Sequence, residues 1–216
     1  RRAAMLCAPD HAEGGRQETV VLPGGGTQIR NRYLDGRPMD VSGTAVVPRF
    51  YDYGVDNDGH LWTMNCEGPA GINSPRWNRR TLDALGRTLR VEKPGFGGET
   101  VTTTFEYNDK GQLAIVRTLL DGDPIQAAVL YEYDELGRST RSTLDANGNE
   151  AVDLSGPDRI NETEAHFVWT GGRWWETVTS KIYPGNDSTP VAVNTQWRKI
   201  SGSGCACTAQ ILKTVD

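Results

Sequence analysis

A four-residue spacing that recurs along the middle of this chain constrains its fold more than any other feature. An Asp or Asn is followed by two variable residues and then Gly, at Asp56–Gly59, Asp83–Gly86, Asn108–Gly111, Asp134–Gly137 and Asp145–Gly148. A short acid or amide can accept hydrogen bonds from the N–H groups of a tight turn, and Gly adopts the positive φ that follows. Between two strands such a turn makes a hairpin with a bulge. The spacing therefore predicts a series of β-hairpins.

The period of these turns indicates a repeat protein. Gly59, Gly86, Gly111 and Gly137 lie 27, 25 and 26 residues apart, which is within the range of structural repeats. The same spacing also occurs without distinctive flanking residues, and composition alone is a sufficient explanation there, at Asp40–Gly43, Asn65–Gly68 and Asp153–Gly156. The regular period distinguishes the spacings that end at these four glycines from the three that composition explains.

Aromatic residues precede three of the turns at alternate positions, in Tyr51–Tyr53, Phe105–Tyr107 and Tyr131–Tyr133. Within a strand the two aromatic side chains point to one face and the residue between them points to the other. We expect the tyrosines of successive hairpins to pack in a row. Arg87 and Arg138 directly follow a turn glycine, and we expect each to pair with the neighbouring acid.

These patterns predict an all-β fold in which antiparallel hairpin repeats form a winding sheet. The 25 glycines and 11 prolines among 216 residues agree with many short strands joined by turns. We expect three regions: a loop-rich lead-in with short strands over residues 1–45, the repeats over 46–150, and a divergent repeat or terminal β-hairpin region over 151–216.

The segment Tyr131–Arg138 reads Tyr-Glu-Tyr-Asp-Glu-Leu-Gly-Arg and resembles the signature of the YD-repeat (RHS-like) family. Leu82–Arg87 and Phe105–Gln112 are close variants, and the resemblance covers roughly residues 47–150. It implies a spiralling β-sheet that is part of a shell or solenoid. In bacterial toxins of this family the shell encloses a C-terminal effector, and in teneurins a similar barrel supports extracellular adhesion.

The resemblance implies a structural segment of a secreted or cell-surface shell or scaffold protein. Its expected partners are the remainder of a longer repeat chain or an enclosed C-terminal domain. The Asp-Pro-x-Gly signature of self-cleaving shells is not found, since Asp123-Pro124 lacks the rest of it. Self-cleavage and toxin activity are therefore not carried over.

An aromatic hairpin follows the repeats. Two β-branched, aromatic runs flank Gly171-Gly172, which predicts a tight turn. Trp169, Arg173, Trp174 and Trp175 offer rings for stacking on sugars and a cation for their hydroxyl groups. Two interpretations stay open: a carbohydrate-binding module that uses this hairpin as a platform, or aromatic side chains buried in the sheet.

Other features restrict the function. No nucleophile elbow, zinc-protease helix or phosphate-binding glycine loop is present in the sequence, so we expect no enzyme, no cofactor and no metal site. A hydrolase would need converging carboxylates.

Charge and hydropathy restrict the partners. The net charge of −5 and the absence of a basic run argue against binding of nucleic acid, and no apolar run predicts membrane insertion. The pairing of four cysteines stays open: Cys7, Cys66, Cys205 and Cys207.

Overall fold

The computed structural model describes residues 15–69 and 73–200, and over these ranges it consists almost wholly of β-strands. The one helical element among the described residues is a short 3-10 turn at Phe96–Gly98. The prediction of an all-β fold is confirmed. The strands are β1 (Arg16–Val21), β2 (Thr27–Arg32), β3 (Pro38–Ser42), β4 (Arg49–Val55), β5 (Leu61–Glu67), β6 (Arg76–Leu82), β7 (Thr88–Pro94), β8 (Thr100–Tyr107), β9 (Leu113–Leu120), β10 (Asp123–Pro124), β11 (Ala128–Tyr133), β12 (Ser139–Asp145), β13 (Arg159–Thr170), β14 (Arg173–Tyr183) and β15 (Ala192–Ile200).

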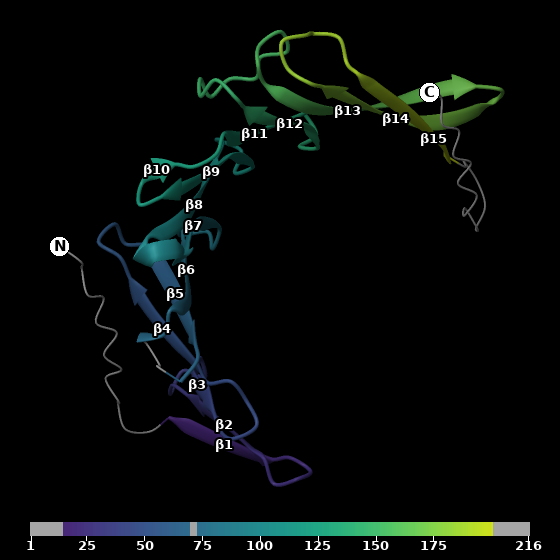
Figure 1. Ribbon diagram of the computed structural model, residues 1–216. Helices are drawn as coiled ribbons and strands as arrows, with labels where there is room; N and C mark the ends of the chain where they lie inside the picture. The colour runs from purple at the N-terminus through teal and green to yellow at the C-terminus, as the bar shows by residue number, and fades with distance from the viewer. Residues whose placement is uncertain (1–14, 70–72, 201–216) are drawn as a thin grey trace. The chain divides into compact units, whose positions relative to one another are not determined.

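Apart from the short β10, strands that are consecutive along the chain are also neighbours in the sheet (Figure 1). The pairings with a resolved register are antiparallel throughout, and β10 pairs only with β9. This confirms the prediction of antiparallel hairpins. The chain divides into two compact units. The first runs to Thr104 and includes Leu119–Asp123, and the second comprises Phe105–Thr118 and the chain from Pro124 onward.

The regions expected at the two ends of the chain also contain strands. The described part of the expected lead-in over 1–45 holds β1, β2 and β3. The described part of the expected terminal region over 151–216 holds β13, β14 and β15, which are the longest consecutive strands. No helix within the described ranges is long and apolar enough to cross a membrane.

Because each strand reverses the direction of the chain, alternate connections lie at opposite strand ends. In the first unit the turns that follow β2, β4 and β6 therefore share one end. In the second unit the turns that follow β8, β11 and β13 share one end in the same way. The regular turns that follow these strands occupy these ends. The opposite ends hold connections of variable length, including the short turn at residues 22–26.

The core of the first unit lies on β5, where Met64 and Cys66 are buried. Phe50, Trp62 and Trp77 pack against them. The guanidinium group of Arg79 lies 4.6 Å from the centre of the Trp62 ring, a favourable cation–π contact. Trp62 also lies across Gly54 of the neighbouring strand, where a Cβ atom would be 2.4 Å from the indole. Only glycine leaves room for this ring.

The core of the second unit is a cross-strand row of buried residues. Leu130 of β11 is paired with Thr143 of β12, Thr143 with Ile160 of β13, and Ile160 with Tyr183 of β14. All four side chains are at most 7% exposed. Residues paired directly across antiparallel strands lie on the same face, so the row forms one continuous strip.

The connection at residues 146–158 lies over the face that carries this strip. Asp145 is the last residue of β12, two positions after Thr143, and Asp158 directly precedes β13, two positions before Ile160. The alternation of an extended chain places both acids on the face of the strip. Both carboxylates are buried. They accept hydrogen bonds from backbone N–H groups of the connection, at Ala146, Gly148, Asn149, Glu150 and Asp153. The two acids thus tie the connection down onto the core.

Candidate functional site

Four connections share one backbone geometry and are called here the Asx turns: residues 56–60, 83–87, 108–112 and 134–138. In each, the N–H of the first residue donates to the carbonyl of the fifth, and the glycine N–H donates back to the first carbonyl. The N···O distances lie between 2.8 and 3.1 Å. The four glycines have φ between +79° and +83°. This is the three-residue hairpin loop with a glycine bulge.

The side chain of the first residue completes each Asx turn. Its Oδ1 atom accepts the backbone N–H of the third and of the fifth residue, in all four turns at 2.8–3.0 Å. Asp and Asn both supply this acceptor at the right length, which is why either appears at this position. The bonds satisfy N–H groups that the bulge removes from the strand ladder.

The fifth residue is chemically matched to the first. Arg87 Nε donates to Asp83 Oδ2 at 2.7 Å, and Arg138 Nε donates to Asp134 Oδ2 at 2.6 Å. Asn108 carries a donor in place of the second oxygen, and its Nδ2 donates to Gln112 Oε1 at 2.9 Å. An acid is followed by a cation and an amide by an amide, because the fifth side chain bonds the remaining atom of the first.

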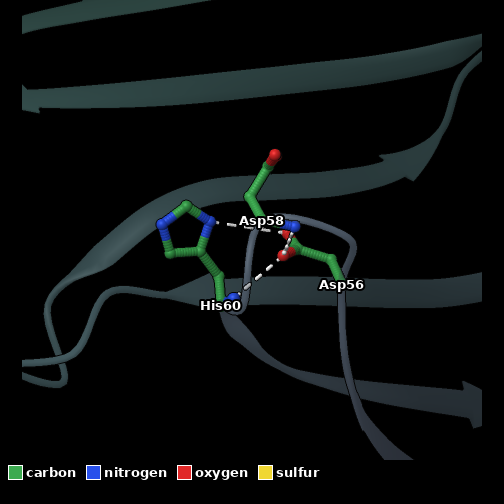
Figure 2. A group of neighbouring side chains, drawn as sticks. All are labelled: Asp56, Asp58 and His60. Atoms are coloured by element: carbon green, nitrogen blue, oxygen red, sulfur yellow. Dashed lines mark hydrogen bonds and ion pairs between the residues drawn. The ribbon is translucent and has the colours of Figure 1, made fainter.

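The first of these turns contains a group of potential metal ligands. Ligand atoms of Asp56, Asp58 and His60 lie within 4.8 Å of one another. Figure 2 shows Asp56 bonded to the backbone N–H and to the ring of His60, whose Nδ1 lies 3.6 Å from Asp56 Oδ2. The N–H groups of His60 and Asp58 lower the pKa of Asp56, against the opposing effect of partial desolvation. Because His60 stands where Arg or Gln stands in the other Asx turns, the turn geometry accounts for this cluster.

Two connections have the same backbone bonds but lack an acid at the first position. In the turn between β1 and β2, Leu22 N–H donates to the Gly26 carbonyl at 2.7 Å and Gly25 N–H donates to the Leu22 carbonyl at 3.0 Å. The other is the turn between β2 and β3. Tyr33 N–H donates to the Arg37 carbonyl and Gly36 N–H donates to the Tyr33 carbonyl, both at 2.9 Å. Here Asp35 at the third position accepts from the N–H and the Nε of Arg37, at 2.9 and 2.6 Å. Sequence reasoning missed this turn because it required Asp or Asn first. An Asp-Gly-Arg search would have found it.

The remaining predicted spacings behave differently. At Asp145–Gly148, the Asp145 side chain accepts the Gly148 N–H as part of the long connection between β12 and β13, so no tight hairpin forms there. Two spacings attributed to composition also carry glycines of positive φ, Gly43 at +128° and Gly68 at +117°. At Gly43 the requirement for glycine also arises from a neighbouring strand, because a Cβ there would meet the Thr27 carbonyl. Such a contact leaves no signal in the residues that flank Gly43.

Tyrosines flank the Asx turns and are half-buried. The Tyr133 hydroxyl donates to the Leu113 carbonyl at 2.8 Å. Tyr53 packs edge-on against Tyr33, with ring centres 6.0 Å apart, and the Arg37 guanidinium lies over the Tyr53 ring. Tyr133 thus joins its strand to the neighbouring strand β9, and Tyr53 contacts the turn at residues 33–37.

A chain of ion pairs crosses the second unit. Arg141 contacts Glu132 at 2.9 Å and Glu162 at 3.2 Å, and Lys181 contacts Glu162 at 3.6 Å and Glu164 at 2.7 Å. The bond between Lys181 and Glu164 raises the pKa of the lysine and lowers that of the glutamate. Arg141 and the three glutamates border a surface hollow. Since each of the three carboxylates has a cationic partner, we assign this chain of ion pairs a structural role.

The four residues proposed as a glycan platform do not share one face of the sheet. Trp169 and Trp174 are directly opposite each other and 58% and 51% exposed. Their ring centres are 5.4 Å apart at an interplanar angle of 62°. Trp175 and Arg173 alternate with Trp174 and lie on the other face. There Trp175 packs against Trp197, with ring centres 6.1 Å apart.

Cys66 is a free, buried thiol, and its burial, together with the charge of Asp52, raises its pKa. A thiol of this kind is unreactive. Cys7, Cys205 and Cys207 lie outside the described residues.

Comparison with known proteins gives one partial similarity. No protein-family model matches the chain. Over 144 residues, the chain is 29% identical to Teneurin-3 of Danio rerio. The matched segment is 64% of this chain but only 5% of that protein. At this coarse level, the comparison supports a relationship to a repeat protein.

Proposed function

We propose that this chain is a structural segment of a secreted or cell-surface scaffold protein, built from hairpin repeats of the YD type. The observation that carries the proposal is the identical hydrogen bonding of four Asx turns about 26 residues apart. Repetition of one local geometry is what an extended array requires, because each unit docks on its neighbours. The similarity to Teneurin-3 and the YD-like motifs support the same function.

The distribution of buried residues also supports a structural role. None of the described side chains in residues 87–111, which form one full period, is fully buried. The two arginines of this period have ion-pair partners in the sheet, Arg87 with Asp83 and Arg90 with Glu92. Such a segment gains its stability from cross-strand neighbours, so that repeats can be added or lost without rebuilding a single core.

Removal of one period tests this proposal. Deletion of residues 88–112 joins Arg87 to Leu113 and keeps the complete Asp83–Arg87 turn between β6 and β9. We expect the shortened chain to keep its β-sheet circular dichroism and a cooperative unfolding transition. The matched control deletes residues 88–111, which leaves one additional residue after the turn and inverts every side chain of β9. If both deletions abolish folding alike, the chain is not a repeat array.

The location of the protein is tested separately. In intact cells of the native host, an epitope-tagged full-length protein should react with a membrane-impermeant biotinylating reagent. A cytoplasmic protein of similar abundance should stay unlabelled. Labelling that appears only after lysis would refute the extracellular part of the proposal.

A second candidate function is carbohydrate binding, and the exposure of Trp169 and Trp174 favours it. Phe167 on the same strand is 60% exposed, so this face offers several aromatic rings. Exposed indoles are typical of surfaces that stack on sugars or bind proteins. Of the predicted platform, only these two tryptophans remain together.

Glycan titration followed by tryptophan fluorescence tests this second function. We expect saturable quenching by a bound oligosaccharide, and its loss in the double variant Trp169→Ala, Trp174→Ala. Trp197→Phe changes a half-buried ring on the opposite face and should leave binding intact. An unchanged signal in the double variant would exclude this pair as the binding surface.

A further inference from the structure

The register of the first hairpin places two arginines directly opposite each other. Arg16 of β1 is paired with Arg32 of β2, and the next pair on the same face is Glu18 with Arg30. Like charges that face each other across antiparallel strands destabilise the sheet. Three guanidinium groups and one carboxylate therefore share one small face. The repulsion between Arg16 and Arg32 calls for an explanation other than stability.

These side chains enclose a hollow of about 440 Å³ at the start of the first unit. Its lining includes Arg16, Glu18, Arg30, Arg32 and Tyr33. Ligand pockets in proteins commonly have volumes of about 300–1,000 Å³. The space is therefore large enough for an anionic group together with part of the molecule that carries it.

The positive charge in the hollow is not neutralised by the described residues around it. Glu18 reaches only Arg30, at 3.9 Å, and Arg30 also donates to the Gln28 side chain at 3.2 Å. Asp35 is paired with Arg37. Arg16 has no ion pair within the ranges that the structure describes. Three cations thus face a single carboxylate.

One of the arginines is held in place by the adjacent turn. Arg32 Nη1 donates to the Gly36 carbonyl at 3.0 Å, which fixes one nitrogen and leaves the other guanidinium N–H groups for a ligand. A guanidinium group presents several N–H donors in a planar fork that matches carboxylate, sulfate and phosphate oxygens. The site is therefore partly organised before any ligand binds.

Protection of the sheet edge is the alternative explanation for exposed charges on an outer strand. It can account for Arg16, because β1 is at the end of the strand order. It does not account for Arg30 and Arg32, which belong to β2 and have strands on both sides. Edge protection also does not require a second arginine opposite the first.

We propose that Arg16, Arg30 and Arg32 form a binding site for an oxyanion, the carboxylate of an acidic sugar or a sulfate or phosphate ester. The anion lies between the opposed guanidinium groups and relieves their repulsion. The Tyr33 side chain forms a wall for the organic part of the ligand. This site goes beyond the structural role proposed for the chain, and neither depends on the other.

Nuclear magnetic resonance of the full chain with labelled arginine side chains tests the proposal. The probes are inorganic sulfate, inorganic phosphate and glucuronate, at constant ionic strength set with chloride, and glucose is the neutral probe. We expect saturable shifts of the Arg16, Arg30 and Arg32 Nε–H signals with at least one anion. A preference for sulfate, phosphate or glucuronate identifies the source of the oxyanion. Shifts that do not saturate, or equal shifts with glucose, would overturn the proposal.

Two variants separate binding from folding. Loss of charge-assisted hydrogen bonds in Arg16→Gln should weaken anion binding about tenfold, while relief of the repulsion should leave the denaturation midpoint equal or higher. The matched control, Arg80→Gln, removes the same charge from an exposed arginine elsewhere in the first unit. It should bind like the unmodified protein. Equally weakened anion binding in both variants would show that the effect arises from net charge alone, and would refute the site.

Discussion

At the scale of single residues, the Asx turn is a small chemical unit that couples its first and fifth positions. One oxygen of Asp134 accepts two backbone N–H groups and the other accepts Arg138 Nε. The side-chain oxygen of Asn108 likewise accepts two backbone N–H groups. In place of a second oxygen Asn108 has an amide nitrogen, which donates to the side-chain oxygen of Gln112. The hydrogen bonds from backbone N–H groups to the first side chain thus restrict the first residue of an Asx turn to Asp or Asn. The choice between these two determines which fifth residue can bond the remaining side-chain atom.

Exchange of the two kinds of pair tests this coupling. Asp134→Asn alone places an amide beside Arg138, and Arg138→Gln alone leaves the carboxylate without its cation. The double variant reproduces the Asn108–Gln112 pair. We therefore expect its denaturation midpoint to be closer to the unmodified protein than either single variant. Additive effects in this double-mutant cycle would show that the two positions are independent.

Acid should weaken the same turn. The backbone N–H of Arg138, and then its side chain, hold the pKa of Asp134 below its ordinary value of 3.8. A carboxyl group whose folded pKa is depressed stabilises the fold above its unfolded pKa, and this contribution is lost as the pH falls through the folded value. Denaturant midpoints of the unmodified protein and the double variant should therefore converge as the pH drops below about 4. A difference between the two midpoints that does not change with pH would show that ionisation of Asp134 is not its cause.

At the scale of elements, the two strand ends of each unit have different roles. The Asx turns close hairpins through contacts within five residues, whereas the connection 146–158 is held by acids at its two limits. Asp158 is fully buried and accepts N–H groups of Ala146 and Asp153, at 2.9 and 3.1 Å. The long connection is therefore an ordered cover for the strip around Ile160.

Removal of the Asp158 carboxylate should release this cover. Asp158→Ala leaves two backbone N–H groups without their acceptor, which costs about 2 kcal/mol or more when such groups stay buried. Hydrogen exchange should accelerate at Ala146 and Asp153 and along the strip beneath them. Asp187→Ala, which removes an exposed acid from another connection, is the control. Unchanged exchange in Asp158→Ala would mean that the connection is held by other contacts.

At the scale of the whole molecule, stability is distributed between separate cores. The first unit is centred on Met64 and Cys66, and the second on the strip that contains Thr143 and Ile160. In a repeat array each segment is stabilised mainly by its nearest neighbours. The chain should therefore respond to damage locally.

Cavities in the two cores test this local response. Met64→Ala should destabilise by about 2–4 kcal/mol and accelerate hydrogen exchange mainly in β4, β5 and β6. Ile160→Ala is the reciprocal variant and should act mainly on β12, β13 and β14. Equal loss of protection in both units from either variant would indicate one cooperative core.

The fold class and most of the regular turns could be predicted from local sequence, because an Asx turn is made within five consecutive residues. Asp83, Gly86 and Arg87 carry all the donors and acceptors that their turn needs. The alternation of tyrosines around Glu132 likewise predicted a strand.

Features that depend on strand register and on coverage of a sheet face could not be predicted from local sequence and follow from the folded chain. Trp169 and Trp174 are exposed because no described segment covers their face, whereas Asp145 is buried because a connection folds over it. The opposition of Arg16 and Arg32 arises from the pairing of residues sixteen positions apart. Neighbouring sequence carries no record of such distant contacts, so burial, ion pairs and the arginine-lined hollow emerged only when the strands were aligned.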